Sequence, residues 1–490
     1  MTKLRNIFLA LTALLISTSS FSQRSIISAG GSHSLFICAD STVWACGYNY
    51  TGAMGNGKNK QSLNSNPEQT LLLTGVIEVA AGNAFSKALK ADGTVWGWGK
   101  NSSYEIGDGT TIERDTAVQL PGVSGIVKIF TGTFSTNGLK SDSTLWLLSG
   151  TSSGTQDTTI YGVIDIGIGG NHSIVLTGDG QVWGIGLNSY GGVGDGSTTS
   201  KSVWTASTGV SNAIKIAAGQ DHSLALLQDG TVMAWGANTN GETGDGTTFS
   251  PRPTPQVVPG LTNIIDVIAN TYSSFALDNK GYVWGWGNNG LGQLGTGDDL
   301  TDHPSPVKLT SIRNVVQIQS LVYHTIAITG DGTIYSWGWN NDGQLGDNTD
   351  STRYESVPVA IGCKADVICT PPTADFDSSV TALNVTFINQ SSFPDSISWD
   401  FGDGNLSNEF DPAHTYADTG IYNVCITAVN SCGSNKKCMD VVVSDLKIPY
   451  CIPSADCSWG DAIKDFTFNT ISNLNTSCDS SSGYHHTGLS

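Results

Sequence analysis

The stretch from Ala217 to Thr248, AAGQDHSLALLQDGTVMAWGANTNGETGDGTT, decides the fold because versions of it recur along most of the chain. An apolar run, SLALL, is followed by Asp229-Gly230 and by a second run of β-forming residues, TVMAW. This order predicts a β-hairpin with a two-residue turn, in which both central residues have a positive φ angle. A glycine-rich loop follows. Because one hairpin cannot bury its own face, its repetition predicts stacked copies.

The copies are counted from one position, the second residue of the run that follows each turn. Its occupants are Trp44, Trp96, Trp146, Trp183, Met233, Trp284 and Tyr335, and their spacings are 52, 50, 37, 50, 51 and 51 residues. Six of these seven units carry Gly three residues later and Asn two residues further on. The third unit has Ser149 and Thr151 there and is the short one, so we expect a blade that is thin at its outer edge and leaves a notch in the rim.

The equal length of the units favours a closed propeller over an open solenoid, since closure removes exposed sheet edges. We therefore predict an all-β protein in which residues 24–361 form a seven-bladed β-propeller. Unit 1 begins directly at Ser25-Ile26-Ile27, without the Pro-x-x-Val strand that precedes other units. The segment from Val357 to Ile361 supplies an unused strand of this kind, so we expect it to enter the first blade and close the ring.

The overall composition narrows the classes of function. Charged residues make up 13% of the chain, and the formal net charge is −19. This balance argues against nucleic acid or an anionic membrane as a partner, because nothing would neutralise the phosphates. Only seven of the 42 acidic residues are Glu, and many Asp residues lie in turns. The acidity is therefore largely turn chemistry and gives little support to a reactive site.

The N-terminal residues 1–22 have the features of a signal peptide. Lys3 and Arg5 precede an apolar segment, and Ser20-Phe21-Ser22 forms a small-x-small cleavage site before Gln23. The apolar segment is short for a membrane span, and we expect no membrane insertion. The mature protein is predicted to be exported and soluble.

Three kinds of segment carry the repeat: AGGSHSLFI, GGNHSIVL and AGQDHSLALL; DGTVWGWG and DGTIYSWG; and GLGQLGTG and NDGQLGDN. These motifs resemble the regulator-of-chromosome-condensation type of seven-bladed propeller. The resemblance implies the fold and a general habit of binding. The family's nuclear founder is a chromatin-bound exchange factor for a small GTPase, a role that export and an acidic surface oppose, so no active residue is carried over.

A second domain follows over residues 371–444, where the repeat gives way to WDFGDG, DPAHTY and GIYNVCITAVNSCGS. The alternation of Tyr422, Val424, Ile426 and Ala428 indicates one half-buried strand of a sandwich. These motifs resemble a PKD-type immunoglobulin-like domain, so we expect a small β-sandwich. The resemblance implies a spacer or adhesive module of a secreted bacterial protein.

The last segment, residues 449–490, resembles the opening of the GEVED type of secreted bacterial domain. The acidic signature that names that family is absent, and few residues are present. We interpret the segment as part of a truncated domain, with a disordered tail as the alternative.

All ten Cys lie after the expected cleavage site, and eight of them fall between Cys363 and Cys478. Clustered Cys in an exported chain favour disulfides over zinc, but eight Cys allow 105 pairings. Cys425 and Cys438 are the best candidate pair, because they lie in consecutive strands of the expected sandwich. With a two-residue turn at Asp40-Ser41, the side chains of Cys38 and Cys46 point to opposite faces of the sheet, which disfavours a disulfide between them. We therefore expect two buried free thiols.

Several motifs admit a functional and a structural interpretation. The letters GWGNNG at residues 285–290 match a dinucleotide loop, which however needs a helix after it. Three aspartates of the sandwich have the oxygens that calcium prefers, although turn formation also explains them: Asp400, Asp403 and Asp411. Four histidines at equivalent positions suggest a metal ring, although Phe or Ser replaces them in other units: His33, His172, His222 and His324. We favour the structural interpretation throughout and predict no cofactor or metal.

The loops after the hairpins carry the candidate ligand-binding residues, which are Trp339, Tyr48, Tyr50, Tyr104 and Tyr190. Equivalent loops of a propeller lie on one face, and Trp339 and Tyr48 come from units that become neighbours when the ring closes. Aromatic side chains on a polar face suit stacking on sugars or anchoring of a protein. Packing over neighbouring blades is the alternative.

We therefore expect a secreted or cell-surface bacterial protein that binds or adheres without catalysis. The propeller is its platform, the PKD-type domain its spacer, and a protein or a neutral glycan its partner. The alternatives are a hydrolase that uses loop carboxylates and a hydrolase whose catalytic domain lies beyond Ser490. The small number of Glu and the lack of a nucleophile motif argue against the first.

If residues 1–22 are a signal peptide, protein recovered from outside the cell begins near Gln23. The intact mass of secreted material should equal that of the chain without residues 1–22. Secreted protein that retains Met1 would contradict this prediction.

Overall fold

The computed structural model describes residues 24–58, 64–151, 154–297, 300–365, 371–430 and 432–444, together with strands β36 (Phe466–Phe468) and β37 (Ile471–Asn473). Every regular element in these ranges is a β-strand. Within them, no helix is long and apolar enough to cross a membrane. The expected signal peptide lies outside the described residues, as does the GEVED-like segment apart from the β36–β37 hairpin.

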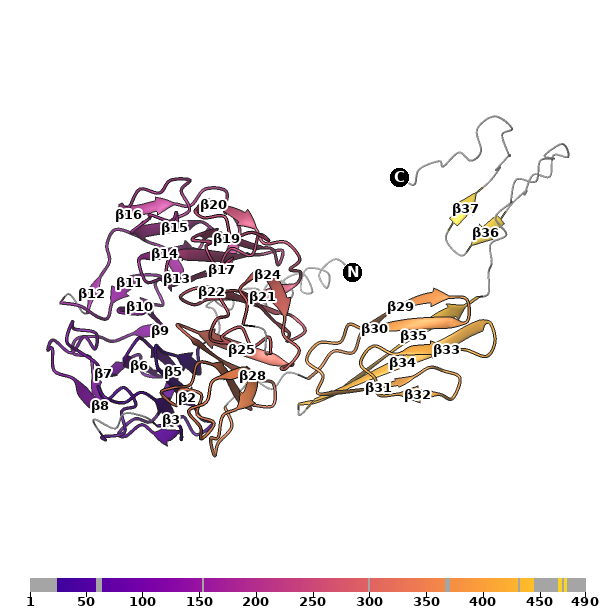
Figure 1. Cartoon of the computed structure of the whole chain (residues 1–490), viewed down its shortest axis with the longest axis horizontal. Helices are drawn as coiled ribbons and strands as arrows, with labels where there is room; N and C mark the ends of the chain where they lie inside the picture. The colour runs from indigo at the N-terminus through magenta and orange to yellow at the C-terminus, as the bar shows by residue number, and fades with distance from the viewer. Residues whose placement is uncertain are drawn as a thin grey trace, which may run out of the picture. The chain divides into compact units, whose positions relative to one another are not determined.

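Seven antiparallel sheets of four strands follow one another round a ring between Ile27 and Pro358 (Figure 1). In every sheet the four strands are neighbours in chain order. The first strand of each blade contacts the first strand of the next, and the first strand of blade 7 contacts that of blade 1. The predicted all-β fold with a seven-bladed propeller is confirmed.

The strands of the propeller fall into four sets by their place in the blade. The inner strands are β1 (Ile27–Ala29), β5 (Val76–Ala81), β9 (Ile126–Thr131), β13 (Val163–Ile168), β17 (Ala213–Ala218), β21 (Ile264–Ala269) and β25 (Val315–Ser320). The second strands are β2 (His33–Ile37), β6 (Phe85–Lys90), β10 (Thr136–Lys140), β14 (His172–Thr177), β18 (His222–Leu227), β22 (Ser273–Asp278) and β26 (His324–Thr329). The third strands are β3 (Val43–Gly47), β7 (Val95–Gly99), β11 (Leu145–Leu147), β15 (Val182–Gly186), β19 (Val232–Gly236), β23 (Val283–Gly287) and β27 (Ile334–Gly338). The outer strands are β4 (Glu68–Gln69), β8 (Arg114–Gln119), β12 (Thr155–Gln156), β16 (Lys201–Ala206), β20 (Arg252–Val257), β24 (His303–Lys308) and β28 (Arg353–Pro358).

The hydrophobic core lies between the blades. Trp337 of blade 7 is buried with Phe275 and Leu294 of blade 6 in one cluster. Another cluster joins Ile27 and other residues of blade 1 to buried residues of blade 7. A blade therefore buries its faces only against its neighbours, as expected for a hairpin that cannot form a core alone.

A hydrogen-bond cluster repeats at the interfaces between blades. The main-chain carbonyl of Glu242, in a loop of blade 5, accepts hydrogen bonds from Ser274 Oγ and Trp286 Nε1 of blade 6, both at 2.8 Å. The same Ser274 Oγ lies 3.0 Å from Nε2 of His222 in blade 5. All of these side chains are buried, so each bond satisfies a polar group that water does not reach. We call this arrangement the carbonyl clamp.

The carbonyl clamp recurs around the ring with small changes. There are two further complete copies. In one, the carbonyl of Ala53 accepts from Ser86 and Trp98, and His33 is bonded to Ser86. In the other, the carbonyl of Gly192 accepts from Ser223 and Trp235, and His172 is bonded to Ser223. The carbonyl of Gln293 accepts from Thr325 and Trp337. At the junction of blades 7 and 1, the carbonyl of Gln344 accepts from Ser34 Oγ and Cys46 Sγ, and His324 is bonded to Ser34.

The ring does not close as the sequence suggested. Val357 pairs with Ser336 of β27 within blade 7, and β28 ends at Pro358, so the expected entry of residues 357–361 into the first blade is wrong. The outer strand of blade 1 is β4, which comes from its own unit and is only two residues long. A local pairing with β27, the preceding strand, costs less loop entropy than one across the ring.

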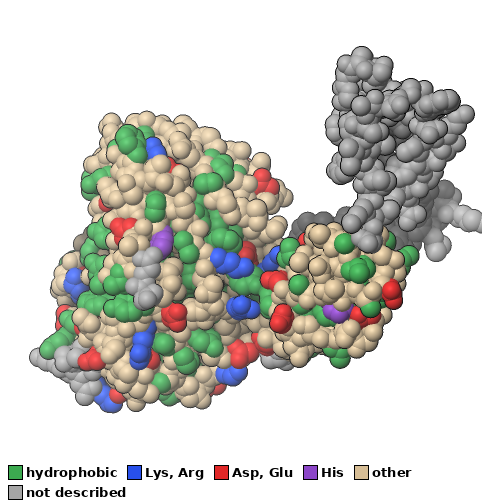
Figure 2. Space-filling model, turned by 45° about the vertical axis from the view of Figure 1, so that its right-hand side comes forward, with side chains coloured by type: hydrophobic (Ala, Val, Ile, Leu, Met, Phe, Trp, Pro, Cys, Tyr) green, Lys and Arg blue, Asp and Glu red, His purple; other side chains and the backbone are tan. Residues whose placement is uncertain are grey.

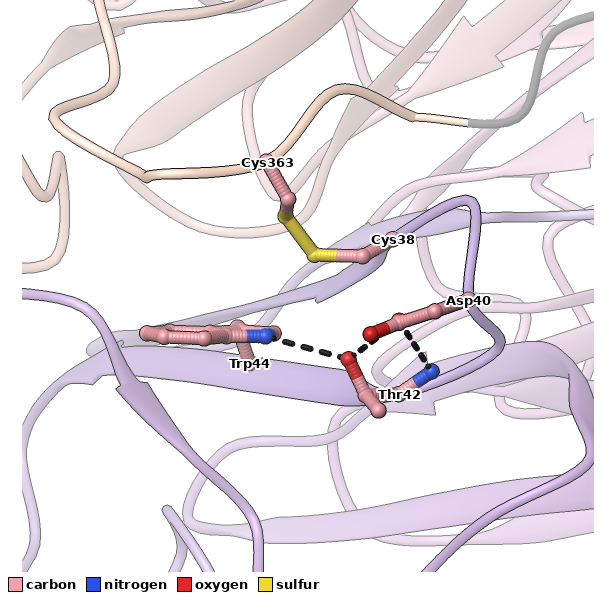
Figure 3. Close-up of a disulfide and its surroundings, with 5 residues drawn as sticks. All are labelled: Cys38, Asp40, Thr42, Trp44 and Cys363. Atoms are coloured by element: carbon pink, nitrogen blue, oxygen red, sulfur yellow. Dashed lines mark hydrogen bonds between the residues drawn. A yellow bond between two sulfur atoms is a disulfide. The ribbon is translucent and has the colours of Figure 1, made fainter.

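A disulfide between Cys38 and Cys363 joins blade 1 to the chain that follows blade 7 (Figure 3). The two Cα atoms lie 5.8 Å apart although 325 residues separate them in sequence. Two main-chain bonds, from Ala39 N to Lys364 O and from Ala365 N to Gly332 O, support the same junction. The expected free thiol of Cys38 is therefore wrong, whereas Cys46 is free and buried as expected.

The turn between the second and third strands also differs from the prediction. Gly230 N donates to Leu227 O, Leu227 N donates to Thr231 O, and Gly230, unlike Asp229, has a positive φ of 83°. These bonds define a three-residue loop with a glycine bulge instead of a two-residue turn. In blade 1 the corresponding loop shifts the register by one residue and pairs Cys46 with Ser34, whereas a two-residue turn would pair it with Leu35.

The side chain of Asp40 holds this loop in blade 1 (Figure 3). Its Oδ1 accepts bonds from the main-chain N and the Oγ1 of Thr42, and Thr42 Oγ1 accepts from Trp44 Nε1. The same chain of bonds recurs at Asp92 and Asp142. The repeated Asp and Trp of the sequence are thus partly explained by one local network.

The third blade is thin at its outer edge, as expected, although it retains a fourth strand. Its outer strand β12 has two residues, whereas β16 of the next blade has six. The short third unit therefore shortens the outer edge of the blade without removing it.

The sandwich consists of two sheets with the strand orders β29-β30-β33 and β32-β31-β34-β35. Its strands are β29 (Phe376–Thr381), β30 (Asn384–Asn389), β31 (Ser396–Asp400), β32 (Leu406–Ser407), β33 (Ala413–Thr415), β34 (Gly420–Asn430) and β35 (Gly433–Val443). Trp399 is buried between the rings of Phe376 and Phe387. Cys425 and Cys438 form a disulfide across β34 and β35, as the sequence suggested.

We expect Cys363→Ser to lower the stability of the propeller by roughly 2–4 kcal/mol, because the disulfide closes a long loop in the unfolded chain. Thermal unfolding under oxidising conditions, followed by Trp fluorescence, measures the change. The double variant Cys425→Ser, Cys438→Ser is the matched control, since it removes a disulfide of the sandwich. An unchanged propeller transition in Cys363→Ser would show that the disulfide does not stabilise the closed ring.

Candidate functional site

One face of the propeller is formed by two kinds of connection, and we call it the loop face. The turns between inner and second strands lie beside the loops between third and outer strands. In blade 7, Trp339 N at the start of the loop donates to Tyr323 O of the turn, and in blade 1 Tyr48 N donates to Ser32 O. Corresponding bonds link turn and loop in blades 2, 4, 5 and 6.

The recurring Asn of the sequence shapes each of these loops. In blade 7, Asn340 is buried, its Oδ1 accepts from Leu345 N, and its Nδ2 donates to Asp347 and to the carbonyls of Thr349 and Ser351. Equivalent bonds hold the loops of Asn101, Asn188 and Asn238. A single buried amide thus fixes a glycine-rich loop that has no regular structure of its own.

All five predicted aromatic residues lie in loops of the loop face, and four of them form pairs or single exposed rings. Tyr48 and Tyr50 form one pair with ring centroids 5.5 Å apart, and Tyr50 is 50% exposed. Tyr190 is 44% exposed. The ring of Trp339 packs edge-on against Tyr323 of its own blade at 5.5 Å, and it is half-buried.

Two further aromatic residues of this face were missed from the sequence, namely Tyr272 and Tyr323. Both occupy the turn position that precedes the recurring His or Ser, and Tyr272 is 40% exposed. In six blades the main-chain carbonyl at this position accepts a bond from the first residue of the loop, a contact that no pattern within the loop sequence records. We call the six residues together the aromatic arc: Tyr190, Tyr272, Tyr323, Trp339, Tyr48 and Tyr50.

Tyr104 has a different role from the other candidates. It occupies the position of Gly52 and Gly191 and has a positive φ of 64°, which is unusual for a residue with a bulky side chain. A Cβ at Gly191 would meet the outer strand of the next blade at Pro253. The next blade after Tyr104 has only the short strand β12, so a tyrosine fits there, and its carbonyl accepts a bond from Gly150 N.

Carboxylates lie close to the aromatic arc. The pKa of Tyr272 is raised first by burial and then by four neighbouring groups, which are Tyr323, Asp221, Glu242 and Tyr190. The pKa of Tyr48 is likewise raised by burial and then by Asp342, Tyr50 and Glu113. The arc therefore combines apolar rings with negative charge, and Asp342 of blade 7 reaches the aromatic pair of blade 1.

The comparisons with known proteins agree with this architecture. Residues 149–382 match the RCC1-like domain, residues 25–53 and 76–105 match the regulator of chromosome condensation (RCC1) repeat, and residues 366–444 match the PKD domain. The propeller is built of RCC1-type repeats.

Several relatives share this RCC1-type propeller. Human E3 ubiquitin-protein ligase HERC2 is 26% identical over 67% of this chain, and the Arabidopsis thaliana ultraviolet-B receptor UVR8 is 26% identical over 65%. The chain spans 5% of the length of HERC2 and 53% of that of UVR8. The likeness thus covers about two thirds of this chain and leaves most of HERC2 unmatched.

One solved structure supports the propeller fold. Prp20p from Saccharomyces cerevisiae matches this chain with a TM-score of 0.60 and 18% identity. The match covers 67% of this chain and 88% of the Prp20p chain, a protein whose binding to Gsp1p and histones has been characterised. The PKD1 domain of the Vibrio cholerae metalloprotease PrtV is 34% identical and covers 15% of this chain and 99% of its own, with a TM-score of 0.15.

The histidines of the RCC1-type propeller have structural partners. A Ser of the next blade is bonded to Nε2 of each of these histidines: His33, His172, His222 and His324. The buried Nδ1 of each ring has no hydrogen-bond partner among the described residues, so the structural interpretation is supported at one ring nitrogen. Burial lowers the pKa of His33 and His172 to about 4 and that of His222 and His324 to about 3. The imidazoles are therefore neutral at physiological pH.

The remaining motifs also have local explanations. The loop after Gly287 leads to the outer strand β24 and not to a helix. Asp400 and Asp403 accept bonds from main-chain N–H groups of the following turn, Asp403 also contacts His414, and Asp411 accepts from Asn389 N. In the part of the chain that the structure describes, no group of three or more His, Cys, Asp or Glu side chains is arranged to hold a metal ion.

The buried histidines predict a pH-dependent stability. Their folded-state pKa values lie below the usual 6.5, so their contribution is present above pH 6.5 and is lost as the pH falls towards 4, because the unfolded chain binds more protons. We expect His172→Gln, His222→Gln to flatten the dependence of the melting temperature on pH between 7 and 4, each imidazole contributing on the order of 2 kcal/mol.

Burial raises the pKa of Glu78 to about 7, which gives the opposite slope over part of this range. The measure is therefore the difference between wild type and the histidine variant across the pH series. Parallel curves for the two proteins would contradict the prediction.

Proposed function

We propose that the chain is a secreted, non-catalytic binding protein that holds a partner on the loop face of its propeller, with the PKD domain as a spacer. The observation that carries this proposal is the aromatic arc. Its rings are partly exposed. Four of them lie on loops that a buried Asn holds in place, and Tyr272 and Tyr323 lie on turns whose carbonyls are bonded to such loops. A rigid, partly exposed cluster of Tyr and Trp is typical of the centre of a binding surface, because such side chains bury much area at low entropic cost.

Export is supported by the cysteines and by the second domain. Cys38–Cys363 and Cys425–Cys438 are disulfides, which persist in oxidising compartments outside the cytosol. Together with the signal pattern of residues 1–22, these bonds favour a location outside the cell.

The absence of a catalytic role is supported by what the loop carboxylates do. Asp108, Asp245 and Asp347 are each bonded to the Arg that begins the following outer strand and to the Asn that shapes their own loop. Carboxylates that are occupied in holding loops are poor candidates for acid or base catalysis.

A protein is the favoured partner, and a neutral glycan is the alternative. Prp20p, which shares the propeller fold, binds the proteins Gsp1p and histones. The side of the propeller visible in Figure 2 shows separate groups of hydrophobic side chains between acidic and basic ones. Such a surface favours binding through a few aromatic anchors over a broad apolar contact.

We expect the double variant Trp339→Ala, Tyr48→Ala to lose binding to ligands found on an array of short peptides and neutral oligosaccharides. Each exposed ring contributes roughly 1–3 kcal/mol when a partner buries it. The melting temperature should stay within a few degrees of wild type, because the carbonyl clamp does not use these side chains.

Tyr161→Ala is the matched control, since Tyr161 is 65% exposed and lies outside the arc. Unfolding of the double variant would show that the two rings are packing residues. Turnover of a peptide or an oligosaccharide by the purified protein would exclude the non-catalytic part of the proposal.

A further inference from the structure

We infer that the aromatic arc binds a protein segment rich in Lys and Arg, whose cationic side chains stack on the rings of Tyr272, Tyr323 and Trp339 beside the carboxylate of Asp221. This inference rests on the proposed function and specifies the chemistry of its partner. It depends on how the acidic side chains of the propeller loops are bonded, which divides them into two groups.

The first group consists of carboxylates that carry their own counter-ion. Each of these carboxylates forms an ion pair with the first residue of the outer strand that follows its loop. The pairs are Asp108–Arg114, Asp195–Lys201, Asp245–Arg252 and Asp347–Arg353. These pairs use up basic side chains where the loops enter the outer strands. Their carboxylates therefore have little net charge to offer to a partner.

The second group lies beside the aromatic arc and is bonded to neutral amides. Asn171 Nδ2 donates to both carboxylate oxygens of Asp221, at 2.9 and 3.1 Å. Glu242 accepts from the main-chain N and the Nδ2 of Asn240, at 2.8 and 2.6 Å. These amides hold the carboxylates in position but leave their negative charge uncompensated.

Desolvation makes this arrangement receptive to a cation. Burial raises the pKa of both Asp221 and Glu242 even though amides donate to them. A partly desolvated anion gains more from an approaching positive charge than an exposed one, because the local dielectric is lower. The bonds from Asn171 fix the carboxylate of Asp221 in the turn of blade 5, within electrostatic reach of Tyr272.

The rings supply the second half of the site. Tyr272 lies within electrostatic reach of Asp221, Glu242, Tyr323 and Tyr190, and Tyr323 packs against Trp339. Lys and Arg side chains bind favourably over the faces of Tyr and Trp, and their aliphatic stems bury apolar area at the same time. A neutral sugar would use the rings but would leave the charge of Asp221 unsatisfied, so the observations favour the cationic segment.

The net charge of the chain agrees with this chemistry. The formal charge of −19 attracts basic partners over distances of about a Debye length, which is about 8 Å at physiological salt. General attraction alone would not require the arc, so a test must separate the local site from the overall charge.

The test titrates the full chain with a synthetic Lys-rich peptide, its Glu-substituted counterpart and a neutral oligosaccharide, with calorimetry as the readout. Two variants probe the site, Asp221→Asn and Tyr272→Ala. Two matched controls lie elsewhere: Glu355→Gln removes one exposed acid of β28, and Tyr161→Ala removes one exposed ring. We expect the site variants to weaken binding of the Lys-rich peptide roughly fivefold to tenfold and the controls to stay within about twofold.

Each other outcome overturns the inference in a recognisable way. Equal losses in Asp221→Asn and Glu355→Gln would mean that the peptide responds only to overall charge. In a second outcome the neutral oligosaccharide binds, Tyr272→Ala abolishes this binding, and Asp221→Asn leaves it intact. The loop face would then be a binding surface, but its partner would be a sugar instead of a cationic segment. In a third outcome a probe binds, but no variant of the arc weakens its binding, not even the double variant Trp339→Ala, Tyr48→Ala. This result would contradict the proposed function as well as the inference.

Discussion

The carbonyl clamp is the interaction on which the rest of the propeller depends. One main-chain oxygen of a loop receives a hydroxyl and an indole N–H from the next blade, and a histidine of its own blade orients the hydroxyl. Blades have no core of their own, so they need a device that fixes one against the next at the correct rotation. Since all the groups are buried, loss of one partner would leave the others unsatisfied, which makes the arrangement specific as well as stabilising.

Most of the fold could be predicted because its signals are local. The spacing of the aromatic position, the hairpins and the alternation of Val424 and Ile426 in the sandwich all depend on residues close in sequence. The failures concern pairings over long distances or single residues of a turn. Cys38 meets Cys363 across 325 residues, which no local pattern records. Asp229-Gly230 and Asp40-Ser41 each suit a two-residue turn or a three-residue loop, and the one-residue difference at Asp40-Ser41 decided the register around Cys46.

The candidate site was predictable in part, for a related reason. The loop aromatics were found because the loops are recognisable in sequence, but their partners come from turns that precede the histidine position. Tyr323 and Trp339 are 16 positions apart by their numbers and become neighbours only through a main-chain bond between turn and loop. The surroundings of Tyr104 could not be predicted, because they are set by the next blade, whose outer strand is short.

The use of a main-chain oxygen in the clamp explains why the loop face can differ from blade to blade. The accepting residues range from Ala53 and Gly192 to Glu242, Gln293 and Gln344. In the last three the Oε atom also accepts from the main-chain N two residues earlier, but Ala53 and Gly192 form the clamp without such a side chain. Every residue has a carbonyl, so the clamp places no demand on these side chains, while the buried Asn holds the loop by its own amide. The scaffold is thus built from groups that point into the interfaces, and the side chains of the loop face are left free to form an aromatic and acidic surface.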